Sequence, residues 1–203
     1  MSRSLRVRTF FVTGVIAAAL AAPSAASAGV LVADAADCES QAFSQPFLPW
    51  ADPASYTLQP GGDFEAGSTK WGGGTVVSEN EPWSVGAASD NGSLHLSAGN
   101  ASVSPSICVG IEHPDIRFFA KGSSPAARLR VDVLFEDAAG NVQSAPIGAI
   151  AGTGDWALTP PFAIIANLLP LLPGSHTAVA FKLTAVSGCW RVDDFYVDPY
   201  TRW

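Results

Sequence analysis

The sequence is poor in basic residues, with 11 Lys and Arg against 18 Asp and Glu among 203 residues and a formal net charge of −7. Proteins that bind phosphate backbones or anionic lipid headgroups attract them through clusters of Lys and Arg. We therefore expect no nucleic-acid partner and no attachment to an anionic membrane surface.

Long apolar runs are absent beyond the N-terminal region. The best later candidate, residues 162–172, is interrupted by Asn167 and Pro170. A helix that crosses a bilayer needs about 20 predominantly apolar residues, so no membrane span is expected.

The N-terminus has the pattern of a secretory signal peptide. Three arginines stand in the first nine residues, an apolar run covers residues 10–22, and the small residues Ala26-Ser27-Ala28 follow. This order predicts cleavage after Ala28, with residues 33–36 as a weaker alternative site. Cleavage there leaves 175 residues, with 8 basic and 18 acidic side chains and a net charge of −10, in a secreted protein.

Cysteines are few and odd in number: Cys38, Cys108 and Cys189. Disulfides persist in exported proteins, so one internal bond is expected. Three cysteines allow three different pairs and leave one thiol over in each case. Their spacing alone does not choose among these pairs.

Common catalytic signatures are also missing, including Gly-x-Ser-x-Gly, His-Glu-x-x-His and Cys-x-x-Cys. The three histidines show no shared spacing for a metal. Paired carboxylates can hydrolyse glycosides, but nothing in the sequence marks two of the available acids as facing one cleft: Glu79, Glu81, Glu136 and Asp137. We therefore expect no enzymatic activity.

What the sequence does contain is period-two alternation of apolar and polar residues, which is typical of half-buried strands. Apolar residues alternate most clearly in residues 129–136 and in the closing segments 179–184 and 192–197. The two closing segments are predicted to pair with each other. Residues 94–97 and 101–104, joined by Gly99-Asn100, are predicted to form a hairpin. Further strands are expected in residues 56–58, 75–78, 107–110, 116–121, 142–150 and 162–165.

This pattern indicates one all-β domain behind the signal peptide. Residues 1–28 are the predicted signal peptide, residues 29–45 a loose leader, and residues 46–203 a single β-sandwich domain. Residues 46–50 are expected to form an ordered coil packed on the sandwich. Residues 166–172 are expected to form a short helical turn, because flanking prolines forbid a longer helix.

Several short motifs resemble the galactose-binding-like jelly roll, the sandwich of many carbohydrate-binding modules. They are Gly62 to Glu65, Trp71, the acidic strand end with its Gly-Asn turn at residues 136–141, Trp156, and the closing run of residues 192–197. Residues 46–65 also resemble a group of secreted bacterial proteins. The resemblance implies a jelly-roll β-sandwich and an extracellular glycan as the ligand class.

Many modules of this kind hold a structural calcium between their first and last strands. Carried over to this chain, the resemblance assigns Glu65 and Asp193 as ligands and Asp63 as a further ligand through its backbone carbonyl. The alternative is that Glu65 and Asp193 accept hydrogen bonds from backbone amides or from an arginine such as Arg191.

The resemblance also points to exposed aromatic rings that stack on sugars. Trp83, in a polar loop, is the leading candidate, and Tyr196 follows because its neighbours Phe195 and Val197 should face the opposite side. Ordinary packing in the core or in a loop is the alternative for both rings. The related secreted proteins favour a disulfide between Cys38 and Cys108, which leaves Cys189 as the free thiol.

Together these features predict a secreted, noncatalytic protein that binds carbohydrate through a jelly-roll sandwich. The main alternative is an extracellular structural or adhesive protein that binds another protein. A glycoside-active enzyme is the weakest candidate, because no pair of catalytic carboxylates is marked.

Overall fold

The computed structural model describes Leu31 and residues 41–67, 71–110, 114–137, 139–164 and 176–199. These residues form a 3-10 turn, η2 (Leu48–Trp50), and antiparallel strands. The strands are β1 (Thr57–Leu58), β2 (Thr75–Ser78), β3 (Gly92–Leu96), β4 (Ala101–Val103), β5 (Ile107–Gly110), β6 (Asp115–Gly122), β7 (Arg128–Glu136), β8 (Val142–Ala151), β9 (Ala157–Leu158), β10 (Phe162–Ala163), β11 (His176–Ser187) and β12 (Trp190–Asp198). Among the described residues, no helix has the length and apolarity needed to cross a membrane.

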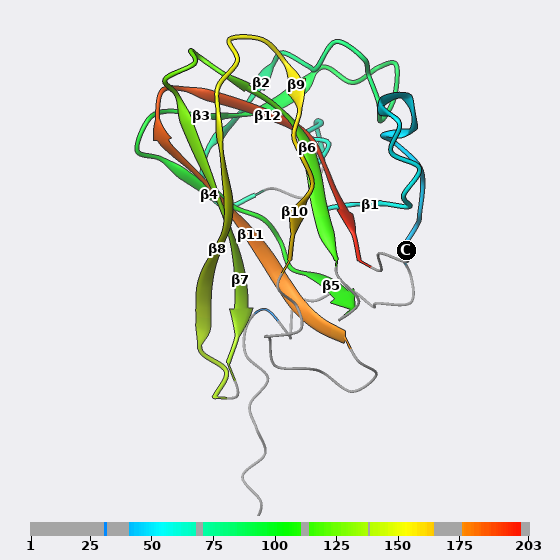
Figure 1. Cartoon of the computed structure of the whole chain (residues 1–203), viewed down its shortest axis with the longest axis vertical. Helices are drawn as coiled ribbons and strands as arrows, with labels where there is room; N and C mark the ends of the chain where they lie inside the picture. Colours follow the sequence, from blue (N-terminus) through cyan, green and yellow to red (C-terminus); the bar gives the residue numbers. More distant parts are fainter. Residues whose placement is uncertain are drawn as a thin grey trace, which may run out of the picture.

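The strands form two sheets that pack face to face (Figure 1). The first sheet has the order β10-β6-β12-β3-β2, with β1 also paired to β12 and β9 to β6. The second sheet has the order β4-β11-β7-β8, with β5 also paired to β11. The predicted all-β jelly-roll sandwich is therefore confirmed.

The core lies between the sheets and follows the alternation in the sequence. Leu129, Val131 and Val133 of β7 are fully buried. Opposite them, Phe118 of β6 stacks on Phe195 of β12 with ring centroids 5.0 Å apart. Burying a side chain of this size stabilises the fold by about 1.5–3 kcal/mol.

The predicted hairpin of residues 94–97 and 101–104 is wrong. β3 pairs with β2 and β12 in the first sheet, whereas β4 pairs with β11 in the second sheet. The chain crosses between the sheets at Gly99, which has φ +84°. A period-two pattern shows which side chains face the core, but it is the same whether the next strand pairs alongside or crosses to the other sheet.

The closing strands do not pair with each other either. β11 pairs with β7, β4 and β5 in the second sheet, and β12 pairs with β6, β3 and β1 in the first. The crossing is made at Gly188, whose φ is +69° and whose added Cβ would lie 2.6 Å from the Cβ of Ala127. Only glycine fits this tight, left-handed connection without strain.

The outer face of the first sheet is covered by the chain segment that precedes β1. Ser44 pairs with Tyr56, and Phe47, the residue before η2, packs against Phe119 of β6 and Tyr196 of β12. Arg117 extends over the Phe47 ring at 5.4 Å from its centroid. Figure 1 shows this segment on the side of the first sheet that faces away from β7 and β8. The predicted packing of residues 46–50 on the sandwich is thus observed, with a 3-10 turn.

The cysteines and the predicted helical turn are described only in part. Cys108 lies buried on β5, whereas Cys189 is exposed with a free thiol. Cys38 and residues 166–172 lie outside the described residues. The pairing of Cys38 with Cys108 and the helical turn therefore stay predictions.

Candidate functional site

The clearest surface feature is an aromatic platform formed by Trp50 and Trp83. Trp50 ends η2, and Trp83 lies in the loop of residues 79–91 between β2 and β3. Their rings are 5.3 Å apart between centroids and nearly perpendicular, at 88°. Both rest on Phe119 of β6, at 5.2 Å and 5.1 Å. The platform therefore joins two distant chain segments over one buried ring.

The platform lines a groove of about 640 Å³. The other residues that line the groove are mostly apolar. Leu48 among them is 53% exposed, and Trp83 of the platform is 45% exposed. The polar side chain in the groove is Gln45, whose Nε2 donates to the carbonyl of Pro53 at 2.5 Å. The full lining is Gln45, Pro46, Leu48, Pro49, Trp50, Trp83 and Val85. Ligand sites of this composition take a molecule with an apolar face and a polar edge.

Tyr196 does not reach this groove. Its side chain is only 6% exposed, and its ring makes a T-shaped contact with Phe47, at 5.5 Å between centroids. Burial raises the pKa of its hydroxyl, and the acidic groups around it add to the shift. The structure therefore brings Trp83 to the surface together with Trp50, which the sequence reasoning had not selected.

The loop that carries Trp83 is folded around a buried carboxylate. Glu81 is 1% exposed and accepts hydrogen bonds from the backbone amides of Trp83 and Val85. Its own amide donates to Oδ2 of Asp193 at 3.1 Å. Ser84, between the two bonded amides, has φ +50°. These contacts set the position of the Trp83 backbone relative to β12.

The end of this loop contributes Asp90 to a group of four carboxylates, which we call the acidic cluster. Its other members are Asp194 of β12 and Asp63 and Glu65, whose charges act on Asp90. A Cβ added to Gly86 would lie 2.6 Å from Oδ2 of Asp90 and 3.2 Å from Oδ1 of Asp194, so these two acids flank the same small space. Asp194 is 1% exposed, and neither of its carboxylate oxygens accepts a hydrogen bond.

The remaining acids of the cluster differ in how well they are bonded. Oδ1 of Asp63 is buried without a hydrogen-bond partner. Oε1 of Glu65 accepts from the amides of Asn91 and Gly92, at 2.8 and 2.6 Å. A buried carboxylate without donors is costly, so Asp194 favours a proton or a cation nearby.

The electrostatics of the region follow from burial and from repulsion between like charges. Burial, followed by the charges of Glu81 and Asp90, raises the pKa of Asp194 to about 8. Burial and the charge of Asp194 raise the pKa of Asp193 to about 9. The pKa of Asp90 is raised by burial first and then by Glu65 and Asp63.

The predicted metal residues fall into two groups. Glu65 and Asp63 belong to the acidic cluster. Asp193 faces the loop instead, because its oxygens accept from the amides of Glu81 and Asp194. Asp194 is the acid that the prediction left out. Among the described residues, no group of three or more His, Cys, Asp or Glu side chains is arranged to hold a metal ion.

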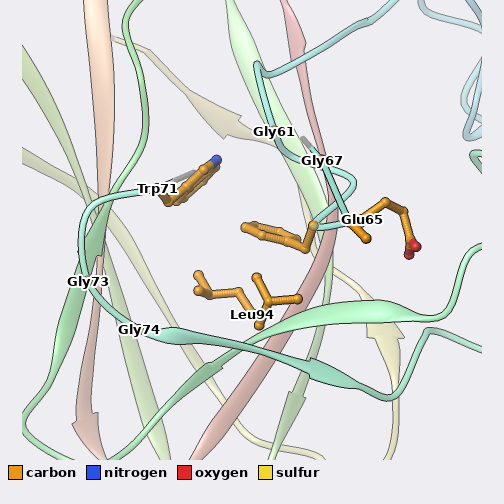
Figure 2. Close-up of a pocket in the computed structure, with 10 residues that line it drawn as sticks. Gly61, Glu65, Gly67, Trp71, Gly73, Gly74 and Leu94 are labelled. Atoms are coloured by element: carbon orange, nitrogen blue, oxygen red, sulfur yellow. The ribbon is translucent and has the colours of Figure 1, made fainter. Parts of the chain in front are cut away.

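A second hollow, of about 420 Å³, is lined by Phe64, Glu65, Trp71 and Leu94, among other residues. Figure 2 shows Trp71 and Leu94 directed into it and the Glu65 carboxylate directed away. Phe64 and Trp71 pack at 5.1 Å between centroids and are 3% and 8% exposed. Because these rings belong to the core, the hollow offers no free aromatic face for stacking.

Comparison with known proteins finds the fold in solved structures only. No protein-family model and no curated protein sequence matches the chain. The C-terminal CBM6 of the marine laminarinase LamC from Zobellia galactanivorans is 13% identical, covers 70% of this chain and 96% of its own, and has a TM-score of 0.44. The CBM22-1 xylan-binding domain of Paenibacillus barcinonensis Xyn10C is 20% identical, covers 69% and 93%, and has a TM-score of 0.45.

Some matching structures are enzymes. An arabinose-bound MgGH51 α-L-arabinofuranosidase is 16% identical, with a TM-score of 0.49 over 74% of this chain and 27% of its own. Similarity at this level concerns the sandwich fold and assigns no ligand or reaction to this chain.

Proposed function

We propose that this protein is a noncatalytic glycan-binding module whose contact surface is the platform of Trp50 and Trp83. The observation that carries the proposal is the partly exposed, perpendicular ring pair held in place by the buried Phe119. A rigid aromatic surface with a neighbouring amide is suited to a sugar ring, which presents C–H groups on its faces and hydroxyls at its edge.

The carboxylates that could support hydrolysis have structural partners instead. Glu79 pairs with Lys121 at 2.7 Å and with Arg191 at 3.1 Å. Glu81 holds the loop amides, and Asp137 accepts from its own turn at Asn141. The distribution of these acids supports binding rather than glycoside cleavage.

The test is glycan binding by the secreted protein, measured on an array and then by calorimetry on the best polysaccharide. We expect Trp83→Ala and Trp50→Ala each to lower the affinity at least tenfold, because each removes one wall of the groove. Val142→Ala, which trims an exposed apolar residue on β8, is the matched control and should bind normally. Binding that survives both tryptophan variants would place the site elsewhere.

A protein partner is the second candidate, and one observation favours it. Phe43 and Leu48, 49% and 53% exposed, belong to the same N-terminal segment as Trp50, and Leu48 lines the groove with Trp83. Contiguous exposed apolar residues mark interfaces as well as ligand grooves. If the protein is adhesive, Leu48→Ala should weaken its binding of a partner protein from extracellular material. In that case no glycan on the array should bind the wild-type protein.

The acidic cluster is our proposed calcium site, with Glu65, Asp90, Asp194 and Asp63 as the residues that would hold the ion. The fit rests on the buried oxygens of Asp194 and Asp63 that have no donors. Calcium would supply positive charge to carboxylates that otherwise repel one another; it takes six to eight oxygens, so backbone carbonyls or water must complete the set.

Calcium at about 100 times its dissociation constant should raise the thermal midpoint by roughly 5–10 °C, because it binds only the folded state. Melting with calcium and with chelator measures this, and Asp194→Asn should remove the difference. An unchanged wild-type midpoint, with no calcium found by elemental analysis, would exclude the site.

Export completes the proposal. The order of basic residues, apolar run and Ala-x-Ala end supports removal of residues 1–28. Intact-mass measurement of the released protein should find a chain that begins at Gly29; a released chain that keeps Met1 would contradict export through this signal.

A further inference from the structure

A row of three basic side chains crosses the outer face of the first sheet. Arg191 of β12 lies directly opposite Lys121 of β6 on one side and opposite His95 of β3 on the other. Like charges at directly opposite positions of neighbouring strands destabilise a sheet. Burial, followed by the charge of Arg191, lowers the pKa of His95, so the positive charge of the row comes from Lys121 and Arg191. This row belongs to a chain whose net charge is −7.

One carboxylate already lies between the two cations. Glu79, which follows β2, accepts from Nζ of Lys121 at 2.7 Å through Oε1 and from Nε of Arg191 at 3.1 Å through Oε2. The spacing of the two cations is therefore that of a carboxylate-binding pair.

Glu79 uses only part of the donor capacity of this pair. In the part of the chain that the structure describes, Arg191 gives its side-chain bond through Nε alone and Lys121 gives one bond, although an arginine has five N–H donors and a lysine has three. Their side chains are 26% and 35% exposed, so the remaining donors reach solvent. Both cations line a small pocket of about 170 Å³, together with Glu79 and the free, exposed Cys189.

The pocket and the aromatic platform lie on the same face of the first sheet. Phe119, which supports Trp83, is two positions from Lys121 on β6, so the two side chains point to the same side and their Cα atoms are about 6–7 Å apart. This spacing is comparable to the length of one sugar residue. A glycan chain with one ring on Trp83 can therefore bring a substituent of the neighbouring ring to Lys121 and Arg191.

We propose that the glycan is acidic, and that Lys121 and Arg191 bind the carboxylate of a uronic acid residue next to the sugar on the platform. The inference rests on the proposed function and adds the class of sugar. Hydrogen bonds between a guanidinium and a carboxylate are about twice as strong as neutral ones, and the planar fork of Arg191 offers two parallel donors. Glu79 competes with the ligand for the same cations.

The positive potential of the pocket is tested without any glycan, through the thiol of Cys189. Its thiolate attacks a methanethiosulfonate reagent, forms a mixed disulfide and releases methanesulfinate. Relative to a free thiol in solution, we expect the anionic sulfonatoethyl reagent to be favoured over the cationic trimethylammonioethyl reagent, because a positive pocket concentrates anions. Arg191→Gln should reduce this preference. A wild-type protein that favours the cationic reagent would overturn the inference.

The class of sugar is tested by calorimetry of the exported protein with polygalacturonate, alginate and glucuronoxylan. Each is compared with its carboxyl-reduced form, which keeps the backbone and loses the charge. We expect one acidic form to bind roughly tenfold more tightly than its reduced form, as for the loss of one charged hydrogen bond. The difference should shrink in about 1 M salt, because exposed charges are screened.

Three variants assign the preference to this pocket. Arg191→Gln and Lys121→Gln should each reduce the preference for the acidic form. Glu79→Gln should instead strengthen the binding of the acidic form, because it removes the competing carboxylate; a purely structural role of Glu79 predicts weaker binding. Lys182→Gln removes a positive charge from β11 of the second sheet and is the matched control, which should bind as the wild type does. Thermal melting checks that each variant is folded.

The outcomes separate this inference from the proposed function. Equal affinities for the acidic and reduced forms, or binding of neutral array glycans alone, would overturn the inference and leave the platform as the binding site. A sulfated polysaccharide such as κ-carrageenan that binds more tightly than every uronic acid form would overturn the assignment of a carboxylate. If no glycan of any kind binds, the proposed function fails and the inference fails with it.

Discussion

Phe118 and Phe119 are neighbours on β6, both fully buried, yet they serve opposite sides of the first sheet. Phe118 faces inward and stacks between Phe162 and Phe195, at 5.8 and 5.0 Å. Phe119 faces outward and supports Trp50 and Trp83. Alternation along one strand thus places a core ring and a site ring at neighbouring positions on opposite faces of the sheet. The two rings differ in what covers them: the second sheet covers Phe118, and two partly exposed tryptophans cover Phe119.

The largest effect on stability should come from removing the core ring, Phe118. Phe118→Ala should lower the free energy of unfolding by about 3–5 kcal/mol, because it leaves a cavity among stacked aromatics. Phe119→Ala should cost less, since Trp50 and Trp83 can settle into the space near the surface, but it should also abolish the platform. Urea unfolding of both variants measures the difference. Equal losses would mean that the outer cluster is packed as rigidly as the core.

The two crossings between the sheets give a second, smaller contrast. Both Gly188 and Gly99 have positive φ, but an added Cβ meets Ala127 at 2.6 Å only at Gly188; at Gly99 it meets nothing within 4 Å. We expect Gly188→Ala to cost about 2–3 kcal/mol and Gly99→Ala about 1 kcal/mol. Chemical denaturation of the two variants is the check, and a costlier Gly99→Ala would contradict the stated steric cause.

These crossings also show which part of the fold could not be predicted from the sequence, namely the pairing of the strands. The alternation in β7, β11 and β12 identified the strands and their buried faces, because burial on one face imposes period two. It did not identify strand partners, because a strand presents the same apolar face whether the chain turns back within one sheet or crosses to the other. Partner choice depends on contacts that are distant in sequence.

The candidate site was predictable to a similar extent. Tyr196 does face outward as its alternation with Phe195 and Val197 predicted, but Phe47, from far along the chain, covers it. Asp194 was passed over because the resemblance matched Asp193 to the Asp of the closing run, and a register shift between Asp193 and Tyr196 changes which acid faces the cluster. Bulges of this kind redirect side chains and carry little local signal.

The outer face of the first sheet also contains an acid, Asp115 of β6, that titrates far from the usual range of an Asp side chain. Burial, then the charges of Asp198 and Asp52, raises the pKa of Asp115 to about 7. The folded state therefore binds this proton more tightly than the unfolded state, whose Asp titrates near 4. The resulting stability is present below about pH 4 and is lost as pH rises toward 7.

Asp115→Asn should remove this loss and raise the stability at pH 8 by about 1–2 kcal/mol, after allowance for solvent screening. At pH 4 the variant and the wild type should be nearly equal. Unfolding measured at both pH values separates this effect from a simple packing change, which would be the same at each. A variant that is destabilised at pH 8 would show that the carboxylate is needed in its charged form.

The smallest effect on stability should come from the platform itself. Trp83 is 45% exposed, and its ring contacts Trp50 and Phe119 at the surface. Trp83→Ala should therefore cost about 1 kcal/mol or less, because an exposed aromatic contact contributes little beyond the area it buries. Its effect on glycan affinity should be much larger than its effect on folding. Denaturation of the same preparation used for calorimetry gives both values. A loss of stability as large as that of Phe119→Ala would mean that Trp83 is part of the outer cluster's packing, and its loss of binding could then be attributed to a disordered loop instead of a missing contact.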